Sequence, residues 1–487
     1  MAIANQPQTV DFKHPGYCEN IVRWMLVDDI CDARNLDSYL IKMNPTDRST
    51  ENAARNKQLF ERAIFYAIAG YTSRGLVGKV FAKDPELIVP ESLDYVSTNI
   101  DGAGISIVQQ SQDALKEVIR KGRAGLFIDM VSTQKELSKS DLAFNFSTVS
   151  LFAASEIINW KTKQIGSQAV LSQVVLATTE DIPGPDGFSF TAVQVRLELR
   201  LDEIAGENGT TSHVYSVVEW RANINNKNLW AKVGSITPTN GAGQTLDRIP
   251  FVFLGSESNT IQIDAAPMYD IAVVNKGHYN NSAIYEDAVF IVGQPQPWMS
   301  GITEDLVALW KTSNMYIGSG RLFGVPSGEQ FGIAQVQPDC LAKEAMNDKV
   351  DMMIGLGAMI IQPGGVAKTA TESAGELLSQ HSVLSLIAAN ISEGYTDALQ
   401  FQAAFMNVDN LPDDMGYTLN QDFIDPAADF NMLREIVAAF MSGAIPIKDY
   451  HEWLKQNRLR NPESKLEDFV AEMGNALNNL DLDDDEA

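Results

Sequence analysis

The sequence is poor in the residues that most often build disulfides, redox centres and metal sites. Only three of its 487 residues are cysteine, namely Cys18, Cys31 and Cys340, and none stands in a CxxC spacing. The five histidines are scattered along the chain. We therefore predict a reducing compartment, no disulfide framework and no metal site.

Basic residues are also scarce. The chain has 37 Lys and Arg against 63 Asp and Glu, a formal net charge of −26. Affinity for nucleic acid comes largely from cations that displace counterions from phosphates, so this balance argues against a protein whose task is to grip DNA or RNA. It remains compatible with a surface past which DNA slides without sticking.

Long apolar runs are missing as well. No stretch of 18 apolar residues occurs, and the first ten residues, Met1 to Val10, are polar and contain no hydrophobic signal region. We expect neither a membrane span nor a signal peptide.

Motifs of catalysis and cofactor binding are absent or incomplete. The sequence contains no GxSxG, no HExxH and no complete phosphate-binding loop; Gly70 and Gly75 have its spacing, but Leu76 stands where the lysine is required. No cofactor is therefore expected. An enzyme whose site is assembled from dispersed Asp, Glu and His residues remains an alternative.

The first half of the chain changes from a helical to an alternating pattern. Apolar spacing predicts one helix around Ile21 to Ile30, a second that stops near Gly70, and a third over 105–121 that is closed by Gly122. The stretch 170–230 alternates apolar and polar residues between turn signals, which is typical of hairpins. These patterns predict an α+β fold that is mainly helical, with a small antiparallel β-sheet.

The second half combines helices with a glycine-rich break. Helical patterns cover 267–285 and 341–361, separated by a segment rich in Gly and Pro, and a Gly-Gly loop follows at 362–372. A stripe with a period of seven then runs for about 50 Å. It comprises Leu377, Leu384, Ile391, Ala398 and Phe405. Two interpretations are open: a core helix of a large helical domain, or a radial strut in a ring assembly.

The order of these elements resembles that of tailed-bacteriophage portal proteins, in particular a portal-like family of phage structural proteins. Several short blocks carry the resemblance along nearly the whole chain. They are Asp11-Phe12-Lys13-His14-Pro15, Gly75 to Phe81, Lys121 to Asp129, Ile157-Ile158-Asn159-Trp160 and Ile249 to Phe253.

This resemblance implies a portal fold with wing, stem, clip and crown regions. The implied regions are wing 1–263, first stem helix 264–290, clip 291–340, second stem helix 341–361, tunnel loop 362–372, long wing helix and return strand 373–424, and crown with an acidic tail 425–487. The chain would then be a non-enzymatic subunit of a dodecameric ring at one capsid vertex, made in the bacterial cytoplasm and incorporated into the virion.

The resemblance also implies partners. They are the terminase large subunit, a head–tail connector or adaptor protein, the major capsid protein, and double-stranded DNA that passes without sequence specificity. Another head or connector protein of the virion is the runner-up within the same setting.

Three groups of residues receive roles on this basis. The tunnel loop at the narrowest part of the DNA channel would use Gly364, Gly365, Lys368, Thr369 and Thr371, although an ordinary helix–helix turn is the alternative. The subunit interface would use Leu377, Leu384, Ile391 and Phe405. Partner contact by the clip would use Trp298, Trp310 and Tyr316, although a core role for Trp310 is equally open.

Overall fold

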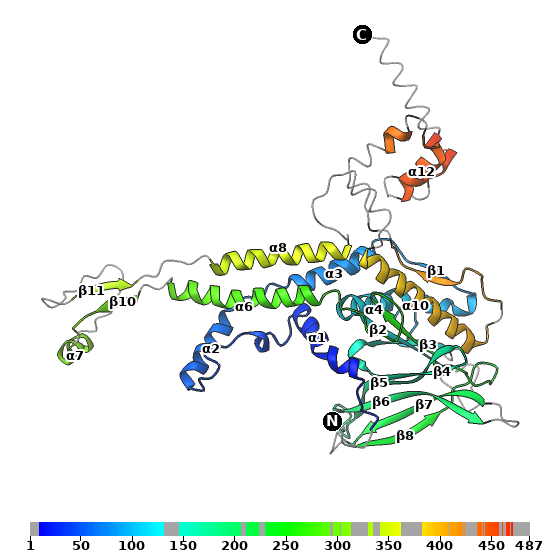
Figure 1. Ribbon diagram of the computed structural model, residues 1–487, viewed down its shortest axis with the longest axis horizontal. Helices are drawn as coiled ribbons and strands as arrows, with labels where there is room; N and C mark the ends of the chain where they lie inside the picture. The colour runs from blue at the N-terminus through cyan, green and yellow to red at the C-terminus, as the bar shows by residue number, and fades with distance from the viewer. Residues whose placement is uncertain are drawn as a thin grey trace, which may run out of the picture. The chain divides into compact units, whose positions relative to one another are not determined.

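The computed structural model shows helices and antiparallel sheets and divides into two units, residues 1–421 and 422–487 (Figure 1). The residues it describes are 9–130, 146–205, 211–223, 229–292, 296–301, 303–312, 330–334, 341–361, 382–408, 410–421, 423, 436–440, 442, 444–456, 460, 464–467 and 469–470.

Local capping explains why two of the predicted helices begin and end where they do. Helix α1 (Pro15–Cys31) starts with proline, and the Nδ1 atom of His14 accepts a hydrogen bond from the Gly16 amide. Helix α4 (Ile107–Lys121) is capped by Ser106 and closed by Gly122 in the left-handed region, with φ of 72°. The prediction of a helix that ends at Gly122 is confirmed.

The second predicted helix is two helices. Helix α2 (Thr50–Arg62) ends before Gly70 is reached, and α3 (Ile68–Val80) contains Gly70 instead of stopping there. The reason is tertiary packing: a Cβ atom at Gly70 would lie 2.3 Å from the carbonyl oxygen of Cys31. This glycine lets α3 approach the end of α1, so it serves close packing and not helix termination.

Four antiparallel sheets occur in the described ranges, so the predicted α+β class is confirmed and the sheet content is larger than expected. Strands β3 (Ser147–Ala153), β2 (Arg123–Met130) and β9 (Phe251–Gly255) form a three-stranded sheet in that order. The predicted hairpins form a five-stranded sheet. Its strands, in order, are β4 (Ile157–Ile165), β5 (Gln168–Pro183), β6 (Phe190–Ala205), β7 (Thr211–Ala222) and β8 (Trp230–Ile236).

Helix α10 (Val383–Met406) packs on the three-stranded sheet and on α4, and it corrects one prediction. Leu384, Ile391 and Phe405 are each 0 % exposed within the single chain. A side chain with no exposed surface cannot contact a neighbouring subunit, so the interface role assigned to these three residues is wrong. Within α10 the period-seven stripe therefore lies in the core of its own chain, which is the core-helix interpretation of the sequence.

Two further helices of the first unit flank a long insert. Helix α6 (Tyr269–Val292) precedes it and α8 (Leu341–Ile361) follows it. Within the insert, β10 (Gln296–Met299) pairs with β11 (Phe331–Ala334), and α7 (Glu304–Thr312) lies between them in sequence. A short strand, β12 (Gly416–Thr418), pairs with β1 (Glu86–Ile88) after α10.

The second unit has a small aromatic cluster around α12 (Ile447–Gln456). Tyr450 stacks on Phe440 with ring centroids 4.3 Å apart, and His451 stacks on Phe469 at 4.8 Å.

Candidate assembly surface

The most distinctive structure outside the core is the pair formed by α6 and α8. The two helices run antiparallel, and α3 packs against both (Figure 1). Glycines allow close contact at two points. A Cβ atom at Gly277 of α6 would lie 3.1 Å from Cε of Lys349, and one at Gly357 of α8 would lie 3.1 Å from the side chain of Thr72 in α3. The three helices therefore form one packed layer.

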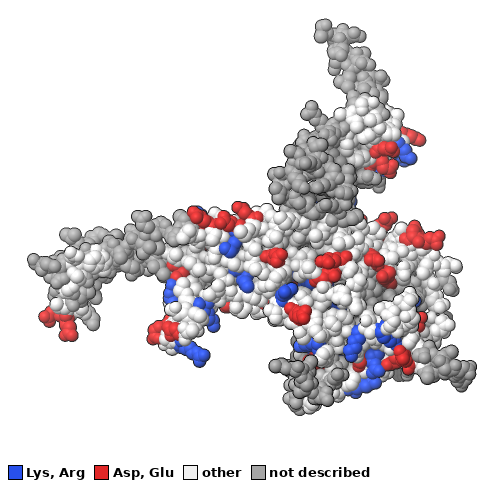
Figure 2. Space-filling model, in the orientation of Figure 1, with Lys and Arg blue, Asp and Glu red and all other residues white. Residues whose placement is uncertain are grey.

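The outward face of α8 carries acidic and apolar side chains together. Glu344, Asp348 and Asp351 are exposed at positions that share one helical face, and Figure 2 shows acidic groups along this helix. The apolar side chains beside them are 49–67 % exposed. They are Leu341, Met352, Ile354 and Met359. A single soluble chain does not need so many large apolar groups in water on one helix.

The outward face of α3 carries an arginine, whereas the outward face of α8 carries carboxylates. Tyr71 is 68 % exposed, and the Arg74 guanidinium lies 4.7 Å from the centre of its ring. Gly75 and Gly78 lie on the same face, and a Cβ atom at either position would meet nothing within 4 Å. No carboxylate occurs anywhere in α3.

Further exposed apolar groups lie on the elements around α6. These are Val22 and Met25 on α1, Ile64 and Tyr66 before α3, and Ile284, Val289 and Phe290 on α6. Because they occur on α6 and on segments close to it, they favour a surface that other protein covers.

A charged cluster fixes α2 to the far half of α6. Asp287 is 3 % exposed, and one of its carboxylate oxygens accepts hydrogen bonds from Nη1 of Arg55 and Nη1 of Arg62, each at 2.7 Å. The second oxygen contacts Nη2 of Arg55. The Arg62 guanidinium also lies 3.8 Å from the ring centre of Phe290. Hydrogen bonds from Arg55 hold the pKa of Asp287 below its usual range.

We expect Asp287→Asn to lower the free energy of unfolding by about 2 kcal/mol, less than for a fully buried pair because both arginines are partly exposed. Urea unfolding measures this change. Since the folded-state pKa is depressed, the stabilisation is present above the unfolded pKa of about 4 and is lost as the pH falls below it. The matched control is Glu286→Gln, at the next residue of α6, which should change the stability by less than about 0.5 kcal/mol. Equal stabilities of the two variants at pH 7 would show that the cluster contributes nothing.

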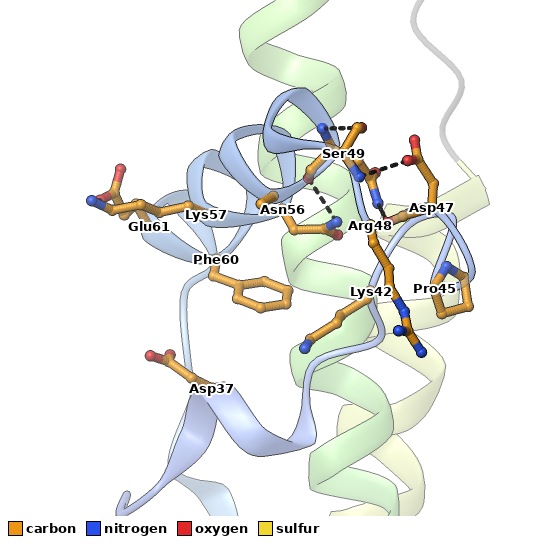
Figure 3. Close-up of a pocket in the computed structure, with 12 residues that line it drawn as sticks. Asp37, Lys42, Pro45, Asp47, Arg48, Ser49, Asn56, Lys57, Phe60 and Glu61 are labelled. Atoms are coloured by element: carbon orange, nitrogen blue, oxygen red, sulfur yellow. Dashed lines mark hydrogen bonds and ion pairs between the residues drawn. The ribbon is translucent and has the colours of Figure 1, made fainter.

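A pocket of about 650 Å³ opens between α2 and the loop before it (Figure 3). Its lining mixes three carboxylates and three cations with the ring of Phe60. The charged residues are Asp37, Asp47, Glu61, Lys42, Arg48 and Lys57. Hydrogen bonds from Ser49 lower the pKa of Asp47, so this group stays ionised and is a poor proton donor at neutral pH. No histidine or cysteine is among these lining residues.

The residues assigned to the tunnel loop cannot be placed, because Gly364, Gly365, Lys368, Thr369 and Thr371 lie outside the described residues, as does Leu377 of the interface set. Of the clip residues, Trp298 is 47 % exposed and lies over Gly332, its partner in the β10–β11 register. Trp310 belongs to α7, but its side chain is not described, and Tyr316 lies outside the described residues.

The histidines that an enzyme would need are not brought together in the described part of the chain. His14 stacks on Trp160 with centroids 4.0 Å apart, His213 lies 3.1 Å from the Lys163 amine, and His278 is buried on α6. Within the same ranges no group of three or more His, Cys, Asp or Glu residues could hold a metal ion, and no helix is long and apolar enough to cross a membrane.

Sequence reasoning missed the surface on α3, the charged cluster at Asp287 and the pocket. The surface on α3 could have been predicted from the composition of this helix. Between Ile68 and Val80 the chain has two cations, three glycines and no carboxylate, which is an unusual composition for an exposed helix in so acidic a protein. The sequence patterns had instead suggested an incomplete phosphate-binding loop at Gly70 and Gly75 and a helix stop near Gly70.

Comparisons with known proteins give limited matches. Residues 267–406 match the model of a domain of unknown function, DUF4055, which covers α6, the insert, α8 and α10. No curated protein matches the chain. Among solved structures, a chain from "Neck of empty GTA particle computed with C6 symmetry" aligns with 82 % of this chain and 92 % of its own length, at 13 % identity and a TM-score of 0.40. A likeness at that level does not establish a shared fold.

Proposed function

We propose that this protein is a structural component of the head–tail junction of a tailed phage, and within that class a portal subunit that forms a ring around the DNA channel. The observation that carries the proposal is the arrangement of α6 and α8. Two antiparallel helices leave a mixed α+β body, hold an insert between them, and expose apolar side chains on their outward faces. Such faces are suited to contacts between subunits.

The regions of the chain take portal roles under this proposal. Residues 1–263 and 373–424 form the wing, α6 and α8 the stem, 291–340 the clip, 362–372 the tunnel loop and 425–487 the crown. The division of the chain into units after residue 421 supports a separate crown that begins close to residue 425. The order of the elements, and the residue blocks that resemble portal proteins, support the rest.

The charge of the chain fits a conduit. With −26 on each subunit, a ring of about twelve carries on the order of −300 charges, so packaged DNA is repelled and not held. Movement of the DNA requires energy that a partner ATPase, the terminase large subunit, supplies. The clip, with Trp298 exposed, is the proposed docking site for terminase and the connector protein, and the wing contacts the major capsid protein.

The test is the assembly state of the purified full-length chain. Mass photometry and negative-stain microscopy at micromolar concentration should show closed rings of about twelve subunits with a central hole. A chain that remains monomeric at both low and physiological ionic strength, with a folded circular dichroism spectrum, would contradict the proposal.

A further inference from the structure

The short segment before α1, residues 10–14, is tied to two strands of the five-stranded sheet. The Asp11 carboxylate accepts hydrogen bonds from Nε and Nη2 of Arg196 in β6, at 3.0 and 2.9 Å. The backbone amide of His14 donates to the carbonyl oxygen of Ile158 in β4 at 2.9 Å. This segment, which we call the strap, therefore fastens the start of α1 to the sheet.

The His14 side chain fits its place only as a neutral imidazole. Its Nδ1 atom accepts a hydrogen bond from the Gly16 amide at 3.1 Å and so caps the start of α1. Because a backbone amide can only donate, this Nδ1 atom carries no proton, and the proton of the neutral ring lies on Nε2. A second proton on Nδ1 removes the acceptor and puts a positive charge at the positive end of the helix dipole. Protonation therefore breaks the cap.

A buried arginine opposes the same protonation. The His14 ring stacks on Trp160 with centroids 4.0 Å apart, and the Arg123 guanidinium lies 4.3 Å from the centre of the Trp160 ring. Arg123 is 1 % exposed, so water screens its charge poorly. An imidazolium is attracted to an aromatic ring, but this ring already contacts one cation. A charged His14 would thus lie near a second positive charge that cannot move away.

The charges around the ring set the direction of its pH response. Burial lowers the pKa of His14 and the charge of Arg123 lowers it further, whereas Glu19 on α1 raises it. Other charged groups on the elements packed against the strap contact partners of their own; they are Lys13, Glu156, Arg196 and Asp264. Since the folded-state pKa is depressed, the cap contributes fully above the ordinary histidine value of 6.5, and its contribution is lost as the pH falls below that value.

His14 also differs from the caps of other helices in the described part of the chain. Helices α2, α4 and α10 are capped by the hydroxyl groups of Ser49, Ser106 and Ser382, which take up no proton near neutral pH. We propose that the strap is released by acid: uptake of a proton at Nδ1 of His14 frees residues 10–14 and the first turn of α1 from the sheet. This inference concerns the single chain and does not depend on the proposed function.

The test is amide hydrogen exchange of the full-length chain at pH 7.5 and pH 5.0, read by mass spectrometry of peptides from residues 9–20. Each rate is divided by that of an unstructured chain at the same pH, which gives a protection factor. Protection of the strap should fall by about 3- to 30-fold at pH 5.0. The upper limit is the proton uptake of a released histidine with an ordinary pKa. Peptides from β2 should keep their protection, because the core stays folded.

Two substitutions at His14 isolate its titration. Asparagine caps helices well and takes up no proton, so His14→Asn should give the same protection of the strap at both pH values. His14→Ala removes the acceptor, so its strap should be poorly protected at both. The matched control is His213→Asn, the same substitution at a histidine of β7, which should show the same fall as the unchanged chain.

Three results would overturn the proposal. The first is equal protection of the strap at both pH values in the unchanged chain. The second is a His14→Asn variant that still loses protection at pH 5.0, because the titrating group then lies elsewhere. The third is an equal loss of protection in β2, which would assign the change to unfolding of the whole body.

Discussion

Replacing Leu384 and Ile391 by aspartate is expected to unfold the body of the chain and not merely to dissociate an assembly. Both side chains are 0 % exposed on the face of α10 that packs within its own chain. An unpaired charge costs several kcal/mol when it is buried, so two of them consume much of a typical stability of about 5–15 kcal/mol. Near-ultraviolet circular dichroism and limited proteolysis should both report loss of the native core.

The same helix provides the control. Val383 and Leu386 are 40 % and 39 % exposed, so Val383→Asp with Leu386→Asp adds the same two charges where water can solvate them. This variant should keep its fold and its melting temperature to within a few degrees. A folded, monomeric chain after the Leu384 and Ile391 changes would restore the subunit-interface role that the burial of these residues excludes.

Adding one methyl group should have opposite effects at two glycines of α3. At Gly70 the new Cβ lies 2.3 Å from the Cys31 carbonyl oxygen, so α1 and α3 must separate; we expect Gly70→Ala to cost about 2–3 kcal/mol. At Gly75 the Cβ meets nothing within 4 Å, so Gly75→Ala should stabilise the chain by about 0.5–1 kcal/mol through its higher helix propensity.

Urea unfolding of the two variants beside the unchanged protein measures both effects. Measurement at high dilution reports the single chain, because assembly depends on concentration. Similar destabilisation at both positions would mean that Gly75 is covered within its own chain, against the open surface that the structure shows.

Local signals were sufficient to predict much of the helical framework. The end of α4 follows from Gly122, whose positive φ no other residue adopts as easily, and the hairpins β5 to β7 follow from alternating polarity and turn residues. In these cases a residue and its immediate neighbours decide the conformation, so no knowledge of distant contacts is needed.

Errors arose where distant contacts decide the structure. Gly70 looks like a helix stop in isolation, but the carbonyl of Cys31, nearly 40 residues earlier, requires a residue without a side chain inside α3. The heptad stripe on α10 has the same pattern whether a sheet of its own chain or another subunit covers it, so periodicity predicted the helix correctly and its partner wrongly. The cluster at Asp287 joins residues more than 220 positions apart, and no local pattern signals it.

The antiparallel arrangement of α6 and α8 makes it easy for the insert between them to be replaced during evolution. The chain leaves α6 at Val292 and enters α8 at Leu341, and these two ends lie at the same end of the helix pair (Figure 1). A segment that begins and finishes at one place can be lengthened, shortened or exchanged for a foreign sequence without displacing the helices that hold it. Recombination at these two borders can therefore replace the insert while the rest of the gene stays the same.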